Sequence, residues 1–558
     1  EIGACDWSSD VCSSDLGVFQ IESAGMTDLC RRMLPRSLED LSALVALYRP
    51  GPLGSGMVDD YIDVRHGKQA AKYPHPALEP VLADTFGVPV YQEQIMRMAQ
   101  VLAGYTLAQA DMLRRAMGKK KPAEMAKHRE LFVAGAAELH NVDAEQANQI
   151  FDLMAVFAGY GFNKAHSLAY AFISYQTAYL KTHYPLAFMA ASMTLDKGNT
   201  DKLLNHKNEL KRMGYELCAP NVNTDRVDFS IKSTAPHEGA VLYALSAIKG
   251  AGEDAMRQLR QAVKANGGVT DIFELAELVP PQVLTRKNLE VLAKSGALDV
   301  LGMPRANILE NLDTIQAYCH NFWEEKNSQQ IGLFGEATGG TLQRPALTTN
   351  NRQDLWETLQ HEQSVLGFYH SDHPLSAYEH IVSRLDYLTP IAQLEQAVDA
   401  GRTEAHIAGI IMAKKEVRTK KGARMGIITL SDAAGQTEVV VFPEAYTRFQ
   451  EMLAQAEPLL VHIGMNRDGE RLRLHAEHLE SLAQQAEKWP QITLKLTETT
   501  DLHEVKHILT SQPAGATACT LVLPANGHGE VKVRLPQKVT CSAAFLQNLR
   551  QVTGVQLL

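Results

Sequence analysis

The sequence lacks the motifs that mark several common classes of protein. Its seven cysteines form no CxxC pair and no His/Cys cluster at zinc spacing, which argues against a structural zinc site and favours a reducing cytoplasm. No run reaches the roughly 18 uninterrupted apolar residues that span a bilayer, so we expect no membrane partner. GxxxxGK[ST], GxSxG and HExxH are all missing, which argues against P-loop NTPases, α/β-hydrolases and zincin proteases.

The sequence also lacks an obvious pair of catalytic carboxylates. Two-metal phosphoryl transfer needs carboxylates that converge on both ions, commonly in D-x-D form on adjacent strands. Asp59, Asp60 and Asp63 lie in GMVDDYIDVRHG, whose pattern predicts a helix with a solvated acidic face. We therefore predict no catalytic residue and no metal ligand in this chain.

The first 16 residues, EIGACDWSSDVCSSDL, lack an initiator Met and the basic and apolar regions of a signal peptide. They look like translated adapter or linker sequence. We therefore leave residues 1–16 out of the fold and expect protein-derived sequence from Gly17. On this interpretation, the chain is a fragment whose upstream part is missing.

The remaining length is enough for three or four domains. Residues 17–215 show helical periodicity, and Ser37 is expected to cap the helix of SLEDLSALVALY, with Asp40 three residues further on. Residues 216–322 have the form of a helix-hairpin-helix region. Residues 323–352 are rich in Gly, Thr, Asn and Gln and are typical of a linker.

The last third of the chain changes from helical to β patterning. Residues 353–400 are interpreted as a helical connector, and residues 401–482 alternate in a way that predicts five short strands of an OB-type barrel. Residues 483–558 form a small mixed segment. The predicted fold class is multidomain α+β: mainly helical and helix-hairpin-helix regions, then a β-barrel and a small α/β C-terminal domain.

Positive charge gathers in one stretch of a chain whose net charge is −10. Residues 110–129, ADMLRRAMGKKKPAEMAKHR, hold seven cations against two acidic residues. Such crowding indicates either a solvated basic helix end or a polyanion that neutralises it. Arg115 and Lys119 are four residues apart, so on a helix they share a face and can grip one phosphate chain.

A second candidate site is YGFNKAHSLAY, where Asn163, Lys164 and His166 lie among aromatic residues. A lone histidine is more often a satisfied core residue. Here, however, the flanking side chains together supply phosphate donors and stacking surfaces. Arg49 follows a helix in LVALYRPGPL, where a loop fixed by Pro and Gly is suited to present a functional side chain.

Two further segments have features of nucleic-acid binding. Lys249, Gly250 and Gly252 form a turn that exposes amides at a helix N-terminus, where a phosphate can be held. The first two barrel strands and their turn carry a set of cations that we predict to bind single-stranded DNA. These are Lys414, Lys415, Arg418, Lys420, Lys421 and Arg424. The alternative is a basic hairpin that keeps the strand edge soluble.

Five motifs together resemble the family of bacterial DNA polymerase III alpha subunits, the C-family replicative polymerases. They are FQIES, LVALYRPGPL, YQEQIM, ADMLRRAMGKKKPAEM and FAGYGFNKAHSLAYA. The resemblance implies roughly the C-terminal half of that subunit, with fingers at 17–215, tandem helix-hairpin-helix motifs at 216–322 and a tau-binding domain at 483–558. It also implies a set of residues that bind the incoming nucleotide and DNA. These are Arg49, Arg114, Arg115, Lys119, Lys120, Asn163, Lys164 and His166.

The resemblance further implies the partners and the cofactor. In this family two Mg²⁺ ions are held by palm aspartates, which would lie upstream of Gly17 together with the PHP domain, so we expect the fragment alone to be inactive. The implied partners are primed DNA, single-stranded template, dNTPs, the sliding clamp, the clamp-loader tau subunit and the proofreading exonuclease subunit. The alternatives are an error-prone paralogue and a non-catalytic DNA-binding scaffold.

The linker contains one short apolar segment, QQIGLFG. This segment resembles the short peptide that binds the sliding clamp. Gln330, Ile331, Leu333 and Phe334 would form it. A flexible tether of this kind docks two apolar side chains into a pocket while the glutamine makes hydrogen bonds. A chance match of so short a peptide is the alternative.

Overall fold

The structure is a computed structural model, and it divides the chain into two compact units. The first comprises Glu1–Ser192, Glu209–Glu216 and Ile231–Val241, and the second the remaining segments. The residues described are 16–119, 122–224, 226–235, 237–327, 343–349, 355–419, 422–432, 435–454, 457–468, 471–524 and 529–557. Within these residues, no helix combines the length and the apolar character needed to span a membrane.

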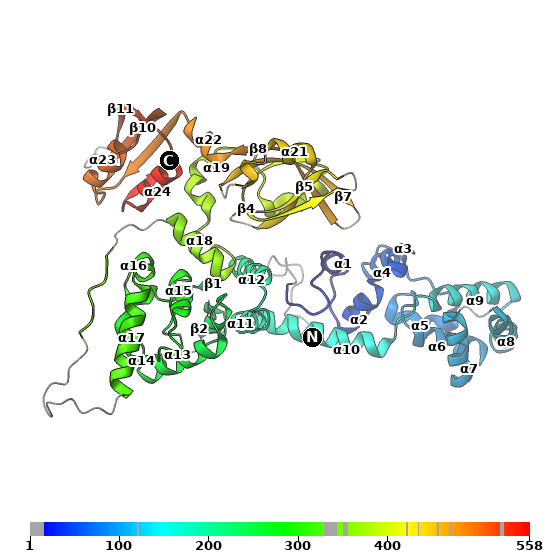
Figure 1. Ribbon diagram of the computed structural model, residues 1–558. Helices are drawn as coiled ribbons and strands as arrows, with labels where there is room; N and C mark the ends of the chain where they lie inside the picture. Colours follow the sequence, from blue (N-terminus) through cyan, green and yellow to red (C-terminus); the bar gives the residue numbers. More distant parts are fainter. Residues whose placement is uncertain are drawn as a thin grey trace. The chain divides into compact units, whose positions relative to one another are not determined.

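Helices build the first part of the chain, as the periodicity predicted (Figure 1). They are α1 (Ala24–Met33), α2 (Leu38–Leu47), α3 (Pro50–Gly54), α4 (Met57–Arg65), α5 (Glu79–Leu82), α6 (Gln92–Ala103), α7 (Leu107–Gly118), α8 (Pro122–His140), α9 (Ala144–Ala158), α10 (Lys164–His183), α11 (Pro185–Leu195) and α12 (Thr200–Arg212). The predicted cap of α2 is confirmed, because Ser37 Oγ accepts a hydrogen bond from Asp40 N at 3.1 Å. In return, Ser37 N donates to Asp40 Oδ2 at 3.2 Å. This reciprocal pair is a capping box.

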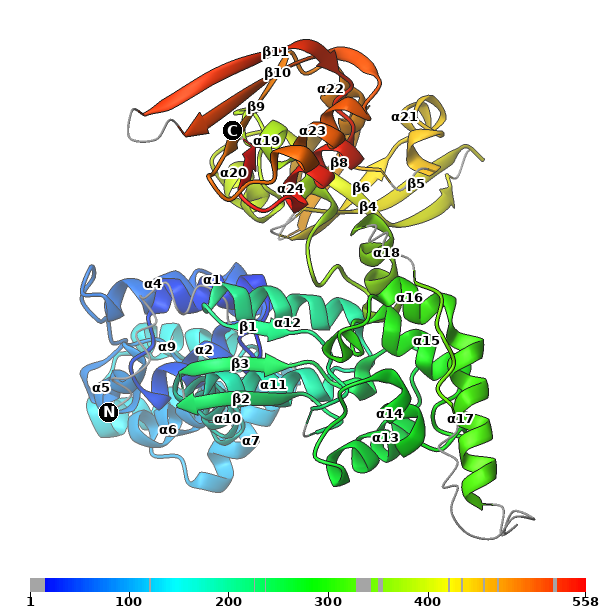
Figure 2. The ribbon, with the colours of Figure 1, turned by 90° about the vertical axis from the view of Figure 1, so that its left-hand side faces the viewer.

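A three-stranded sheet follows these helices, with β3 (Glu238–Leu242) between β1 (Glu216–Cys218) and β2 (Ser230–Ala235) (Figure 2). The next helices belong to the helix-hairpin-helix and connector regions. They are α13 (Glu253–Ala265), α14 (Ile272–Leu278), α15 (Arg286–Lys294), α16 (Arg305–Glu310), α17 (Leu312–Asn327), α18 (Leu355–Leu366), α19 (Glu379–Val382) and α20 (Leu394–Asp399).

The segment expected to be a linker, 323–352, is only partly outside regular structure. Helix α17 continues to Asn327, and Arg344 forms ion pairs with Asp271 at 3.2 Å and with Glu277 at 3.0 Å. The predicted clamp peptide, which begins at Gln330, lies outside the described residues.

Five strands form a closed barrel in the order β4-β5-β6-β8-β7. They are β4 (Glu404–Arg418), β5 (Arg424–Ser431), β6 (Gln436–Val441), β7 (Leu459–Asp468) and β8 (Arg471–Ser481). Ile407 of β4 and its partner Val461 of β7 are completely buried in the barrel core. Helix α21 (Pro443–Arg448) follows β6. The predicted five-strand barrel is therefore confirmed.

The C-terminal segment forms a four-stranded sheet in the order β11-β10-β9-β12. Its elements are α22 (Leu482–Glu487), β9 (Gln491–Leu496), α23 (Leu502–Thr510), β10 (Ala514–Pro524), β11 (Glu530–Val539), α24 (Ala543–Gln551) and β12 (Val555–Leu557). The β9–β10 pair is parallel and the other pairs are antiparallel. Together with the barrel and the helices, this segment confirms the multidomain α+β class.

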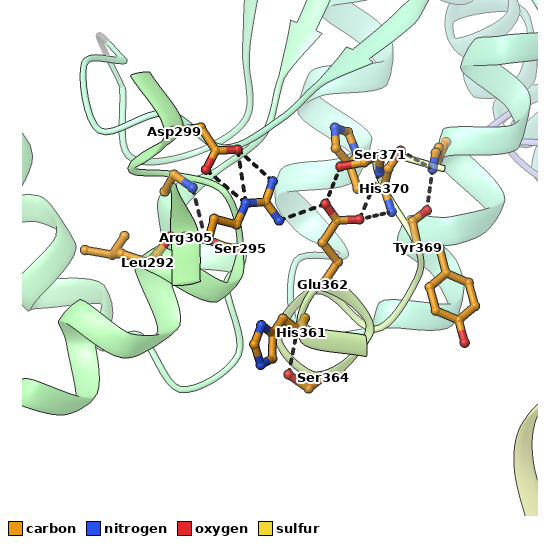
Figure 3. Close-up of polar contacts among 12 residues, drawn as sticks. Leu292, Ser295, Asp299, Arg305, His361, Glu362, Ser364, Tyr369, His370 and Ser371 are labelled. Carbon is orange, nitrogen blue, oxygen red and sulfur yellow. Dashed lines mark hydrogen bonds and ion pairs between the residues drawn. The ribbon is translucent and has the colours of Figure 1, made fainter. Parts of the chain in front are cut away.

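A buried carboxylate anchors α18 to the helix-hairpin-helix region. Figure 3 shows Glu362, which is fully buried, between Arg305 and Ser371. It accepts from Arg305 Nη1 at 3.0 Å and from the backbone amides of His370 at 2.8 Å and Ser371 at 2.9 Å. Asp299 also pairs with Arg305, at 2.7 Å. Burial by itself raises the pKa of Glu362, but the hydrogen bonds from Ser371 and the charge of Arg305 outweigh it and hold that pKa below the usual value.

Replacing Glu362 with Ala should reduce the stability of this region by about 3 kcal/mol, because it leaves buried donors without an acceptor. Hydrogen exchange of the α18 amides measures the loss. Since the folded pKa is lowered, the carboxylate stabilises the fold above its ordinary pKa of 4.5, and this contribution disappears as the pH falls further. Glu357→Ala is the control, because that side chain is 62% exposed on the same helix. Equal losses in both variants would contradict the prediction.

Candidate nucleic-acid interface

Two segments that are far apart in sequence meet at the start of α6. Tyr91 and Phe162 form a parallel β-bridge, in which Gln92 N donates to Phe162 O at 2.9 Å. Phe162 N in turn donates to Val90 O at 3.1 Å. The bridge brings the YQEQIM and YGFNKAH motifs together. The predicted patch around Asn163 and His166 therefore includes the YQEQIM segment, which the sequence alone did not place there.

The first turn of α6 holds three polar residues that each bind a different part of the chain. Gln92 Nε2 donates to Gly161 O at 3.1 Å, and Gln94 Oε1 accepts from the backbone amides of Val90 and Tyr91, each at 2.9 Å. Glu93 receives donors from the start of α10. This turn therefore fixes the geometry around it, and none of its residues was among the predicted site residues.

Glu93 and Asn163 define the N-terminus of α10. Asn163 Oδ1 caps the helix by accepting from His166 N at 2.8 Å, while Asn163 Nδ2 donates to Glu93 Oε1 at 2.9 Å. Lys164 N donates to Glu93 Oε2 at 3.0 Å. Glu93 thus occupies the helix terminus where an anion would otherwise bind. The Lys164 ammonium lies 5.4 Å from the centre of the Tyr91 ring, where it can contribute its charge.

Helix α7 places the predicted arginines near the first turn of α6, with α6 and α7 side by side (Figure 1). Arg114 Nη1 donates to Gln92 Oε1 at 3.2 Å, and Arg114 Nη2 pairs with Asp111 at 2.7 Å. Arg115 Nε pairs with the other oxygen of Asp111 at 2.9 Å. Hydrogen bonds from Arg114 lower the pKa of Asp111, so this carboxylate stays ionised and partly neutralises both arginines.

The two arginines differ in exposure. The side chain of Arg114 is 26% exposed and that of Arg115 is 66% exposed. Lys119 is exposed at the C-cap of α7, and α8 begins at Pro122, a residue that suits the first turn of a helix. Lys120 lies outside the described residues. Of these cations, Arg114, Arg115 and Lys119 therefore lie along the C-terminal part of α7 and at its cap.

Arg49 and His166 flank the aromatic ring of Phe162. Arg49 Nη2 donates to Tyr160 O at 2.6 Å, and its guanidinium carbon lies 4.6 Å from the centre of the Phe162 ring. His166 is exposed and lies 5.5 Å from Phe162 and 4.3 Å from Tyr170 between ring centres. His166 is therefore a surface residue beside aromatic rings. Its exposure excludes the alternative that it is a buried core histidine.

The aspartates of α4 do not fit a two-metal site. Asp59 is ion-paired with Arg32, and Asp63 pairs with Lys68 at 3.2 Å. Asp59 and Asp60 are exposed. In the part of the chain that the structure describes, only one group of three side chains lies within reach of a common metal ion, and it is on the barrel. Asp59 and Asp63 therefore serve as ion-pair partners of neighbouring cations.

The predicted hairpin turn is formed as expected. Gly250 has φ +89°, which favours glycine, and Gly252 is the N-cap of α13. Lys249 is exposed, and its backbone amide donates to Val365 O at 2.8 Å. The first turn of α13 also carries Glu253, whose negative charge opposes a phosphate at this terminus.

The predicted barrel cations that the structure describes lie on β4 and β5. Lys414 and Lys415 are exposed neighbours in β4, so their side chains point to opposite faces. Arg418 pairs with Arg424 in the ladder, and Glu416 partly neutralises Arg424 at 3.5 Å. The remaining two cations, Lys420 and Lys421, lie outside the described residues. The charge is therefore spread around the hairpin.

Comparison with known families adds to this geometry. Residues 11–140 match the model of the bacterial DNA polymerase III alpha subunit finger domain, and residues 214–308 match a helix-hairpin-helix motif. The DNA polymerase III subunit alpha of Caulobacter vibrioides is 38% identical over 551 residues, covering 97% of this chain and 47% of that protein. The subunit from Escherichia coli (strain K12) is 37% identical over 558 residues, with the same coverage. That of Haemophilus influenzae is 41% identical over 464 residues, covering 81% of this chain and 39% of that protein.

The helical fold and these two matches define a polymerase finger region followed by a helix-hairpin-helix region. The chain belongs to the family of bacterial DNA polymerase III alpha subunits. It spans about half the length of the relatives it matches. Arg49, Arg114, Arg115 and Lys119 lie inside the finger match, whereas residues 163–166 lie beyond its end.

Replacing Glu93 with Ala should loosen the start of α10, because Lys164 N and Asn163 Nδ2 lose their acceptor. We expect a local cost of about 1–2 kcal/mol, or roughly tenfold faster exchange of the Lys164 and His166 amides. Hydrogen exchange followed by mass spectrometry measures this change. Glu130→Ala on α8 is the control, since Glu130 is exposed. Unchanged exchange in Glu93→Ala would show that α10 is positioned by packing alone.

Proposed function

We propose that this chain supplies the part of a replicative DNA polymerase that positions the incoming nucleotide and the DNA. The observation that carries the proposal is the ridge formed by residues 91–94 and 160–166. Along it, the side chains of Arg49, Arg114 and Lys164 are held by named contacts beside the exposed ring of His166. Cations next to stacking surfaces are what a nucleotide requires.

The restraint on each arginine suggests separate roles. Arg114 is fixed by Gln92 and Asp111, so its guanidinium is preorganised and loses little freedom on binding a phosphate. Arg115 pairs with Asp111 and is more exposed. It can turn toward a triphosphate or the DNA backbone when such an anion competes with Asp111.

The nucleotidyl-transfer chemistry is proposed for the intact subunit. The divalent ions, Mg²⁺ in our proposal, would be held by palm carboxylates supplied by the rest of that subunit. This chain would bind primed DNA without extending it. Incorporation of dNTPs by the purified chain would contradict this division of roles.

The other regions are proposed to hold the DNA and the partners of replication. The turn at Lys249–Gly252 would contact phosphates of duplex DNA, and the basic β4–β5 hairpin would bind the single-stranded template. The tau subunit would bind residues 483–558, and the exonuclease subunit would join the intact enzyme. The family match supports a DNA polymerase over a non-catalytic scaffold. An error-prone paralogue remains the alternative within the family.

In the intact subunit, replacing Arg114 or Arg115 with Ala should lower nucleotide incorporation by roughly 10²–10³-fold, because a charge-stabilising donor is removed. Single-turnover primer extension measures the effect, and binding of primed DNA without nucleotide should change much less. Arg→Lys variants should show an intermediate loss of incorporation, since lysine keeps the charge but lacks the guanidinium group that makes two parallel hydrogen bonds.

Lys127→Ala is the matched control for these arginines, because it removes an exposed cation from the same basic stretch. Its incorporation rate should remain close to that of the parent. If the arginine variants instead lose duplex affinity in proportion to activity, they grip the DNA backbone and the triphosphate is held elsewhere.

Replacing both Leu333 and Phe334 with Ala should weaken binding to the sliding clamp by at least about 2 kcal/mol, or tens-fold. These side chains would be the buried anchors of the peptide. A titration of the chain with purified clamp measures the affinity, and Leu342→Ala in the same segment is the control. Unchanged affinity in the double variant would show that QIGLF is only part of the linker.

A further inference from the structure

One outer face of the barrel carries a row of histidines across three neighbouring strands. His406 on β4 pairs in register with His462 on β7, which pairs with His478 on β8. The rings of His406 and His462 stack with 4.3 Å between centres and 12° between planes. Three imidazoles in one row are an unusual concentration of metal-ligating groups, and the proposed polymerase function does not use them.

The next row contains Glu404 on β4, Gly464 on β7 and His475 on β8. A Cβ at Gly464 would lie 2.3 Å from His475 Cε1 and 2.9 Å from Glu477 Oε1. Because Gly464 has no side chain, the side chains of His475 and Glu477 can occupy the space beside this position of β7. The result is an open position on the strand that is surrounded by imidazole and carboxylate groups.

A β-bulge turns Glu477 toward this position. Ala476 pairs with Ile463 and His478 pairs with His462, so Glu477 is the extra residue of β8. Ala476 is buried in the barrel, whereas Glu477 and His478 are consecutive exposed residues. Bulges re-aim side chains in this way and are common beside functional sites. Without the bulge, consecutive residues would point to opposite faces.

His462 lies between the two glutamates. Its Nε2 is 3.3 Å from Glu404 Oε2, and its Nδ1 is 3.3 Å from Glu477 Oε2. One ligand atom from each of the three residues lies within 4.8 Å of the others. An imidazole binds an ion through one nitrogen, so a zinc ion at about 2.0–2.1 Å would use either Nε2 beside Glu404 or Nδ1 beside Glu477 at this 3.3 Å ligand spacing. The other carboxylate would complete the site by a change of rotamer.

We propose that Glu404, His462 and Glu477 bind one divalent transition-metal ion, of which Zn²⁺ is the representative, across β4, β7 and β8. An imidazole with two carboxylates suits such an ion, whereas Mg²⁺ and Ca²⁺ prefer all-oxygen sites. His475 is a positioning residue, since its Nε2 lies 3.5 Å from Glu477 Oε1. The bound ion would join three strands of the barrel from the outside.

Titration of the metal-stripped chain with Zn²⁺ by isothermal calorimetry tests the proposal, with Mg²⁺ as the comparison ion. We expect one Zn²⁺ that is lost in His462→Ala, weakened at least about tenfold in Glu477→Gln, and not displaced by excess Mg²⁺. Loading should also raise the thermal unfolding midpoint of the parent chain but not of His462→Ala. His320→Ala is the matched control, because His320 also lies 3.3 Å from a glutamate, Glu324, but on a helix.

Two outcomes would overturn the proposal. Zn²⁺ binding that is equal in the parent, His462→Ala and Glu477→Gln would place the ion elsewhere, for example on a cysteine. Absence of Zn²⁺ binding by the parent chain would mean that His462 serves only as the ion-pair partner of the two glutamates. Circular dichroism of each variant confirms that these exposed substitutions leave the fold intact.

Discussion

The candidate interface depends on a buried chain of hydroxyl groups that joins three helical segments. Tyr91 Oη donates to Ser42 Oγ at 3.0 Å, and Ser42 Oγ lies 2.8 Å from Ser167 Oγ. These residues are almost completely buried, and burial raises the pKa of Tyr91, so its hydroxyl stays protonated and able to donate. An unpaired hydroxyl in this core would cost about 1–3 kcal/mol, which makes the three segments mutually dependent.

This constraint explains why the side chains of the candidate interface lie near one another. Along the chain, Ser42 is seven residues before Arg49, Tyr91 is two residues before Glu93, and Ser167 directly follows His166. Once their hydroxyls are paired, Arg49 at the end of α2, Glu93 in α6 and Lys164 in α10 are brought to the same side. Within the ridge, the hydrogen bonds of Gln92 with Gly161 and of Glu93 with Lys164 then complete the arrangement.

Local signals in the sequence were sufficient for the elements but not for their long-range contacts. The capping box of Ser37 and Asp40, the start of α8 at Pro122 and the five barrel strands follow from spacing and side-chain chemistry within a few residues. The contact of Glu93 with Asn163 joins residues 70 positions apart, and periodicity carries no information about such a pair. The bulge at Glu477 was equally invisible, because only the partner strand reveals the extra residue.

The position of Glu93 also decides how an anion can be held at the ridge. A helix N-terminus ordinarily offers free amides to a phosphate, but here Lys164 N is bonded to Glu93 and His166 N to Asn163. The anion binding that we propose would therefore rely on side chains, which carry a full charge but must be held in place by other contacts. Gln92 and Asp111 support Arg114, and the Tyr91 ring lies beside Lys164. Since Asp111 also binds Arg115, a phosphate bound as proposed would have to displace this carboxylate, which would favour highly charged anions such as a triphosphate over weaker ones.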